Sequence, residues 1–275
     1  MTVFVMQKYE VENHEPSYLP DGKKWKLVWN DEFDGDKLDD TKWDFRCSLM
    51  GKRNPSWLWR DGIRFENSNI IFMPTEKWGD IRCAQLQTGY NYMDEPATCN
   101  YSGDYVWPIS KIKEPKFMHR YGYYECRCKL QKKKGWWTAF WLQSPQIGST
   151  LNPAVSGVEN DIMESFTPGI LAHHANHYNG YGADHKQVNH GEDRPISLDE
   201  YHTFGMMWNK DGYTFYVDGV EDGHSDAPVS HVEQFILIGA EINGYRTQFN
   251  TAETRDVLGD EFTVDYVRVF DEIEE

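Results

Sequence analysis

The chain contains the stretch Gly157-Val158-Glu159-Asn160-Asp161-Ile162-Met163-Glu164-Ser165-Phe166, which holds three carboxylates within six residues. The apolar residues among them favour a partly buried strand over an exposed acidic edge. In a regular strand, Glu159 and Asp161 share one face and Glu164 points the other way. One β-bulge between Asp161 and Glu164 would bring all three onto one face. The stretch therefore predicts a bulged strand with a face of carboxylates.

The rest of the chain is also strand-like. Residues 123–130 and 262–270 alternate between two kinds of side chain, and residues 213–217 run into Asp218-Gly219, a turn pair typical of hairpins. No stretch shows a helical period over 12 residues. Many short strands with Gly and Asp turns predict an all-β sandwich or barrel in one domain over residues 25–275. The polar, irregular residues 1–24 are expected to form an N-terminal arm.

Composition narrows the class of protein. The 275 residues carry 28 basic and 44 acidic side chains, which gives a net charge of −16. Nucleic acids and anionic membranes both attract a positive field, so neither is an expected partner. No apolar run approaches the roughly 18 residues that cross a bilayer. Aromatic residues make up 15% of the chain and 11 of them are Trp, which favours a carbohydrate ligand because flat rings stack on the apolar faces of sugars.

The cysteines do not form a disulfide framework in the sequence. There are five of them, so at least one thiol is unpaired. Cys126 and Cys128 would share a strand face with Cα atoms about 6.6 Å apart, where a disulfide is strained. We interpret most of the cysteines as buried thiols. Residues 1–10 lack the basic start and long apolar run of a signal peptide.

Two glutamates on one strand face could serve a retaining glycosidase, whose carboxyl groups lie about 5–5.5 Å apart. Asp161 between them would repel negative charge on its neighbours, or donate a hydrogen bond to the nucleophile. A calcium loop is another interpretation, although the spacing lacks its Gly and oxygen pattern. The spacing alone leaves catalysis and a structural role equally open.

The motif Glu159-x-Asp161-x-x-Glu164 resembles the signature of family 16 glycoside hydrolases in its bulged form. Residues 25–35 resemble the first strand of that family, residues 135–142 the strand before the catalytic one, and residues 264–269 the closing strand. Residues 201–208 and 215–219 resemble its paired later strands. The resemblance spans roughly residues 25–270, almost the whole chain.

The resemblance implies a β-jelly-roll of two curved antiparallel sheets with an open substrate cleft on the concave face. It implies retaining cleavage inside β-linked polysaccharides, with Glu159 as nucleophile, Asp161 as assisting carboxylate and Glu164 as general acid/base. Glu164 would then need a raised pKa in order to arrive protonated. No cofactor is expected for catalysis. Family members often carry one structural calcium bound by a late Asp, and Asp265 matches that position loosely.

The substrate is harder to predict. Residues 173–186 resemble the corresponding segment of agarases and porphyranases, in which a His faces the cleft near the nucleophile; here His177 is the candidate. Laminarinases usually show Trp-Pro where this chain has Trp137-Thr138. The resemblance therefore implies cleavage of β-1,4 galactosidic bonds in a red-algal galactan, with porphyran ahead of neutral agarose. A β-1,3-glucanase and a non-catalytic lectin on the same fold are the alternatives.

Candidate substrate-binding residues lie in two segments. Trp57 and Trp59 would share a strand face and stack on galactose, while Arg60 or Arg64 could bind a sulfate through charge-assisted hydrogen bonds. Core burial of both Trp and solvation of both Arg is the alternative.

Residues 136–141 are the second segment, and their large side chains alternate between the two faces of a strand. Trp137 and Trp141 share one face, which we expect to line the cleft, and Trp136 and Phe140 share the other, which we expect to fill the core. Glu241 is expected to reach the substrate from a neighbouring strand.

A polysaccharide too large to import implies a secreted, cell-surface or periplasmic enzyme whose signal peptide is absent from this chain. A monomer is expected.

Overall fold

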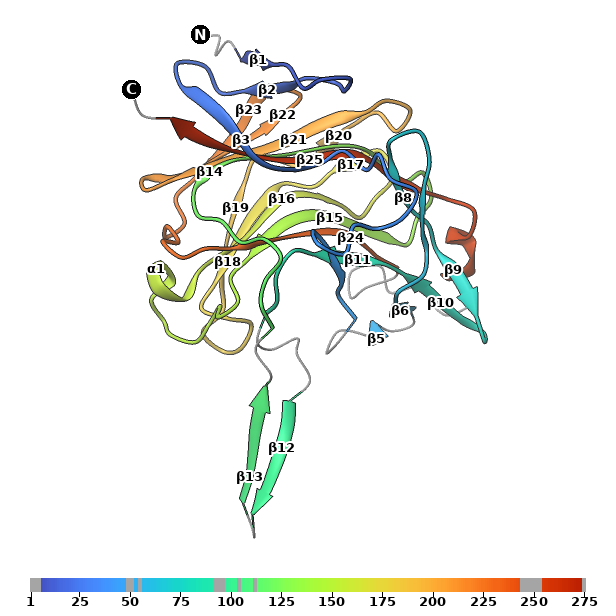
Figure 1. The fold of residues 1–275 in the computed structure, drawn as a ribbon, viewed down its shortest axis with the longest axis vertical. Helices are drawn as coiled ribbons and strands as arrows, with labels where there is room; N and C mark the ends of the chain where they lie inside the picture. The colour runs from blue at the N-terminus through green and yellow to red at the C-terminus, as the bar shows by residue number, and fades with distance from the viewer. Residues whose placement is uncertain are drawn as a thin grey trace.

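The computed structural model describes residues 6–47, 52–53, 56–91, 97–102, 105–110, 113–242 and 254–273. Two large antiparallel sheets face each other (Figure 1), which confirms the all-β prediction. The helices in the described residues are the one-turn α1, Pro153–Ser156, and the 3₁₀ helix η1, Arg255–Val257. No described helix is long and apolar enough to cross a membrane.

One sheet has seven strands and carries the carboxylate stretch. Its spatial order is β19 (Lys186–His190), β18 (His174–Tyr178), β16 (Glu159–Ser165), β15 (Trp136–Gln143), β24 (Phe235–Ile242), β11 (Gln85–Gln87) and β4 (Asp44–Phe45).

The facing sheet has eight strands. Its order is β23 (Val220–Ser225), β22 (Gly212–Val217), β21 (His202–Asn209), β14 (Gly122–Lys129), β25 (Phe262–Ile273), β8 (Ile70–Phe72) and β7 (Ile63–Phe65), and β3 (Lys24–Asp31) also pairs with β25.

Smaller sheets surround these two layers. They are β1 (Gln7–Tyr9) with β2 (Ser17–Leu19); β5 (Lys52–Arg53), β6 (Ser56–Leu58), β10 (Asp80–Cys83) and β9 (Thr75–Lys77) in that order; β12 (Ala97–Ser102) with β13 (Tyr105–Ser110); and β17 (Ile170–Leu171) with β20 (Arg194–Pro195).

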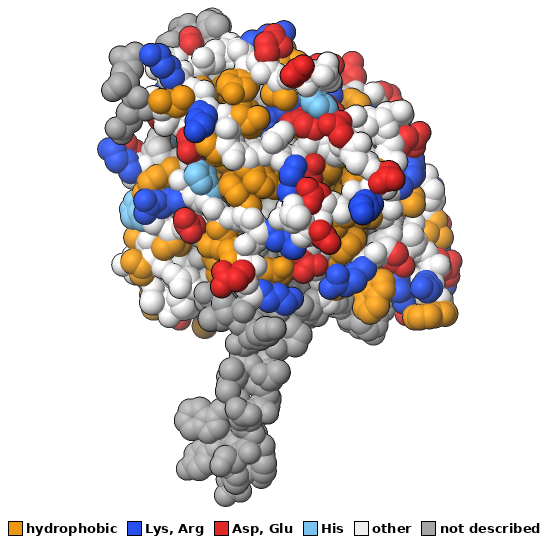
Figure 2. Space-filling model, in the orientation of Figure 1, with side chains coloured by type: hydrophobic (Ala, Val, Ile, Leu, Met, Phe, Trp, Pro, Cys, Tyr) orange, Lys and Arg blue, Asp and Glu red, His pale blue; other side chains and the backbone are white. Residues whose placement is uncertain are grey.

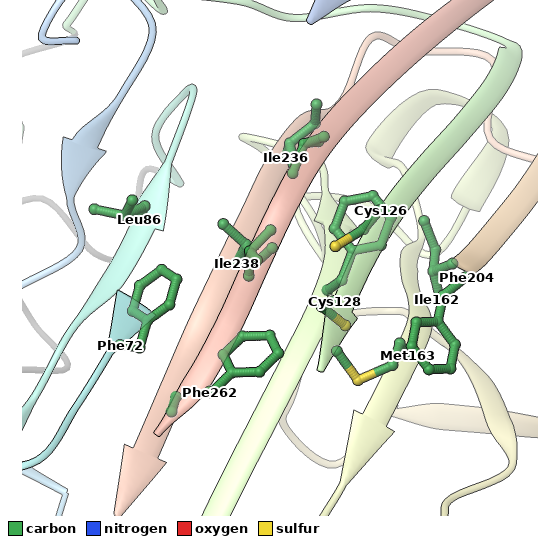
Figure 3. Close-up of a cluster of buried hydrophobic side chains, with 14 of the residues drawn as sticks. Phe72, Leu86, Cys126, Cys128, Ile162, Met163, Phe204, Ile236, Ile238 and Phe262 are labelled. Atoms are coloured by element: carbon green, nitrogen blue, oxygen red, sulfur yellow. The ribbon is translucent and has the colours of Figure 1, made fainter. Parts of the chain in front are cut away.

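The core fills the space between the two large sheets (Figure 3). Ile236 and Ile238 of β24, Phe204 of β21 and Phe262 of β25 all belong to this layer, and all four are fully buried. Alternate residues of each strand enter this layer, as the period of two requires. The buried thiols of Cys126 and Cys128 lie in the same layer and form no disulfide, as the sequence indicated.

Charge is spread rather than gathered on one face of the molecule. On the face drawn in Figure 2, basic side chains are interspersed with acidic ones among the residues that the structure describes. With a net charge of −16, this face offers no broad positive field to a polyanion.

Part of the predicted N-terminal arm is ordered against the eight-stranded sheet. Strands β1 and β2 pair as a hairpin instead of remaining irregular. Leu19 packs into a cluster with Trp25, Tyr123 and Phe270. The fully buried guanidinium of Arg268 donates to the Glu15 carbonyl at 2.8 Å and to Ser17 Oγ at 2.9 Å, and it also pairs with Glu32. Buried apolar contacts and a desolvated cation therefore fix the arm.

Candidate active site

A β-bulge in β16 brings the three carboxylates onto one face. The register against β15 shifts so that Phe140 pairs with Met163 while Trp141 pairs with Asp161, which leaves Ile162 as the extra residue. Ile162 and Met163 are both fully buried in the core. Asp161 and Glu164 consequently point to the opposite face, together with Glu159. The predicted bulge is thus present at the predicted place.

The Glu159 carboxylate accepts hydrogen bonds from two side chains. Gln143 Nε2 donates to Glu159 Oε2 at 2.9 Å, and the Tyr181 hydroxyl donates to the same oxygen. Burial, and then the negative charge of Asp161, raise the pKa of Glu159 to about 7. The positive charge of His177 and the Tyr181 hydrogen bond oppose that rise. Glu159 is therefore a carboxylate whose ionisation depends on its neighbours.

His177 lies directly opposite Glu159, on β18. Its Nε2 is 3.2 Å from Asp161 Oδ2, and its Nδ1 is 2.8 Å from His185 Nε2, with the two imidazoles stacked at 5.1 Å. Burial alone would lower the pKa of His177, but the Asp161 hydrogen bond and the surrounding carboxylates raise it to about 9. A protonated His177 donates from both nitrogens, so neutral His185 serves as an acceptor.

Glu164 is buried beside an indole. Trp137 Nε1 donates to Glu164 Oε1 at 2.6 Å, and the Trp137 ring meets Phe166 edge-on at 5.5 Å. This bond fixes one carboxyl oxygen of Glu164 on the face that Asp161 also occupies.

The tryptophans of β15 divide between the two faces of the sheet. Trp136 and Phe140 are fully buried in the core, whereas Trp141 belongs to a separate cluster on the carboxylate face. The guanidinium of Arg46 lies 5.0 Å from the Trp141 ring centre. Glu241 pairs in register with Trp137. The carboxylate face thus carries aromatic rings next to the carboxylates.

Four predicted binding residues lie elsewhere or cannot be placed. The Trp57 side chain falls outside the described residues. Trp59 follows β6, in the small four-stranded sheet, and is 42% exposed. Arg60 is exposed and its Nη1 is 3.4 Å from Asp44. Arg64 is on β7 of the eight-stranded sheet, where Glu261 binds its Nη1 at 2.5 Å.

The placement of Arg64 corrects the prediction that it grips a sulfate next to the carboxylates. Gly62, with φ of 87°, separates β6 from β7. A Cβ there would lie 2.5 Å from the Met73 carbonyl oxygen, so only glycine fits the turn. The segment from Trp57 to Arg64 therefore divides between two sheets.

The surroundings of Asp265 do not fit a calcium site. Arg127 Nη1 binds Asp265 Oδ2 at 2.5 Å, and the same guanidinium lies over the Tyr201 ring at 4.5 Å. A cation of the chain itself thus neutralises the carboxylate that calcium would use.

Within the described residues, one group has the spacing of a metal site, namely Glu159, Asp161 and His177, whose ligand atoms lie within 4.8 Å of one another. A histidine binds a metal ion only as the neutral imidazole. The raised pKa of His177 disfavours that form, and the imidazolium itself occupies the position of a cation.

Tyr181, Gln143, His185 and Arg46 are site residues that the sequence analysis did not select. Gln143 could have been found, because it follows Trp141 by two positions on the same strand face. Tyr181 and His185 belong to the loop after β18 and carry no periodic signal.

Tyr181→Phe is expected to lower kcat by roughly 10- to 100-fold, since a hydrogen bond to a charged group contributes about 1.5–3 kcal/mol. Losing the donor should also raise the pKa of Glu159, so the acidic limb of activity should move to higher pH. The measurement is the pH profile of kcat/KM for both proteins. A lower kcat with an unmoved limb would contradict the assigned hydrogen bond.

Comparison with known proteins gives the family of the chain and supports its fold. The model of the family "Glycosyl hydrolases family 16" matches residues 88–233. The chain is 24% identical to a glucan endo-1,3-beta-glucosidase A1 of Niallia circulans over 90% of its length, and 29% identical to beta-porphyranase D of Zobellia galactanivorans over 70%. It spans 38% and 46% of those two proteins. An endo-beta-1,3-glucanase structure from Pyrococcus furiosus superposes with a TM-score of 0.68 at 21% identity, covering 93% of this chain and 97% of that one.

The chain therefore belongs to glycosyl hydrolase family 16. This family comprises glycoside hydrolases of the retaining, endo-acting type.

Proposed function

We propose that Glu159 is the nucleophile, Glu164 the general acid/base and Asp161 the assisting carboxylate of this hydrolase. The observation that carries the proposal is the bulge at Ile162, which aligns the three on one face. Glu159 attacks the anomeric carbon while Glu164 protonates the leaving glycosidic oxygen. Water then attacks the glycosyl-enzyme, and Glu164 takes up its proton.

The neighbours of the carboxylates have defined tasks in this reaction. The Trp137 N–H orients Glu164, and the Gln143 and Tyr181 donors orient Glu159 and favour its ionised form. Protonated His177 balances the charge of Asp161, so that two carboxylates can be ionised side by side. Trp137, Trp141 and Glu241 are proposed to contact the sugar.

A neutral β-1,3-glucan is the substrate that we favour. A glucan endo-1,3-beta-glucosidase and an endo-beta-1,3-glucanase are among the proteins that resemble this chain. The structure also removes one of the two cations on which a sulfated substrate was predicted, because Arg64 is on the other sheet and paired with Glu261. The net charge of −16 repels a polyanion at long range, although salt screens that repulsion beyond about 8–10 Å.

Porphyran is the second candidate. The 29% identity to beta-porphyranase D supports it, as does Arg46, a cation stacked on Trp141.

Reducing-sugar release should be measured side by side on laminarin, mixed-linkage β-glucan, porphyran, agarose and κ-carrageenan. We expect the highest kcat/KM on laminarin. Release from porphyran alone would replace the glucan assignment by the galactan one. Binding to the polymers with no release from any would favour the lectin alternative. Since such polymers are too large to import, we also propose that the enzyme acts outside the cytoplasmic membrane.

A further inference from the structure

The turn between β9 and β10 carries an indole in an unusual backbone conformation. Trp78 and Gly79 form a two-residue hairpin turn, which the pair Lys77 and Asp80 closes. Trp78 and Gly79 both have positive φ, 55° and 86° respectively. Such turns favour Asn, Asp or Gly at the first position, and a bulky side chain there is strained. Trp78 is also 83% exposed, so neither the turn nor the core accounts for this residue.

A buried arginine connects this indole to a second one. The centre of the Arg82 guanidinium is 5.0 Å from the ring centre of Trp78 and 5.0 Å from that of Trp59. The two ring centres are therefore no more than about 10 Å apart. Arg82 is only 6% exposed, and its Nε and Nη1 have no hydrogen-bond partner among the described residues, although Nη1 lies 3.8 Å from Asp61 Oδ2. Its cation–π contacts hold both rings in place.

We propose that Trp59 and Trp78, held by Arg82, form a binding platform for a β-linked polysaccharide chain on the small four-stranded sheet. The ligand class rests on the proposed function. The platform belongs to the small four-stranded sheet, not to the seven-stranded sheet that holds Glu159 and Glu164. The β9–β10 hairpin is seen at the edge of the two-layered body in Figure 1.

The shape and chemistry of the platform favour a sugar chain over a protein. Two indoles offer about 150–250 Å² each, well below the roughly 800 Å² per partner of a stable protein interface. The C–H groups on one side of a pyranose match the negative face of an indole, and rings this close can contact neighbouring units of one chain. Lys77 Nζ also lies 4.9 Å from the Trp78 ring centre, but it is exposed, so a sugar can displace it.

Trp78→Asn separates binding from folding, because Asn suits this turn better than Trp does. Binding is measured by affinity electrophoresis through gels that contain laminarin or porphyran. For the polymer that retards the parent protein, we expect the affinity of the variant to be lower by about tenfold or more. That loss is typical of a central indole in an interface. Both proteins should carry Glu164→Gln to prevent digestion. The Tm should stay unchanged or rise, and kcat on short oligosaccharides, measured without Glu164→Gln, should not change.

Tyr18→Ala is the matched control, since Tyr18 is 41% exposed on the β1–β2 hairpin; it should leave retardation unchanged. Equal retardation of Trp78→Asn and its parent would overturn the platform. So would absence of retardation of the parent by a polymer that the active enzyme cleaves. Retardation that depends on Trp78, without cleavage of any polymer, would instead refute the proposed function and leave the platform standing.

Discussion

Glu164→Gln should lower kcat on the natural polymer by about 10²–10⁴-fold, the usual contribution of a positioned general acid. Glu159→Gln should have at least as large an effect, since it removes the proposed nucleophile. Asp161→Asn should lower turnover less than either. The comparison is made by initial rates of reducing-sugar release. Near wild-type turnover in Glu164→Gln would show that the acid lies elsewhere.

Two further measurements test the double-displacement mechanism and the integrity of the fold. The first-formed product of the wild-type enzyme should keep the β configuration in NMR spectra, as a double displacement requires. Because the pKa of Glu159 is raised from 4.5 to about 7, this group favours the folded state below pH 4.5, and that contribution is lost as the pH rises through 7. The Tm of Glu159→Gln minus the Tm of the wild type should therefore be more positive at pH 8 than at pH 4. A lower Tm at both pH values would indicate damaged packing.

His177→Gln should move the acidic limb of kcat/KM to higher pH. In the wild type this limb should lie near pH 7, where Glu159 ionises, and activity should fall at both ends of a bell-shaped profile. Protonated His177 lowers the pKa of Glu159, so removing that charge raises it further. The variant should lose most activity at pH 6 and recover part of it at pH 8.

His185→Gln is the matched control for that experiment. Burial lowers the pKa of His185, so it adds no charge at neutral pH, and Gln can still accept the hydrogen bond from His177. Its profile should follow the wild type. The Tm gives a second test: the raised pKa of His177, about 9, stabilises the fold below pH 6.5 and ceases to do so as the pH rises through 9. His177→Gln should lack that fall in Tm; an equal fall in both proteins would contradict the His177–Asp161 ion pair.

The bulged strand could be predicted because the order of residue types requires it. Ile162 and Met163 stand together where a regular strand would bury only one of them, and carboxylates flank the pair. The division of the β15 tryptophans between the two faces follows from the same period of two.

The remaining site residues depend on features that periodicity does not contain. Tyr181 reaches Glu159 from a loop that begins with Asn179 and Gly180, both at positive φ. Arg64 was assigned to the wrong face of the molecule because the turn at Gly62 depends on a close contact with Met73, a residue 11 positions further along the chain. Loop geometry and contacts between distant segments decide both placements, and a single sequence states neither.

The seating of the N-terminal hairpin also determines where this domain can be cut. A boundary at residue 25, chosen from sequence alone, passes between Arg268 and two of the acceptors that it uses, the Glu15 carbonyl and the Ser17 hydroxyl. The truncated protein would keep the buried guanidinium of Arg268 but would lose two of its hydrogen-bond acceptors. It would also lose the contact of Leu19 with the eight-stranded sheet. For engineering, grafting or fusion, the smallest transferable unit therefore begins before β3. The β1–β2 hairpin is an integral part of the domain and not a removable terminal extension.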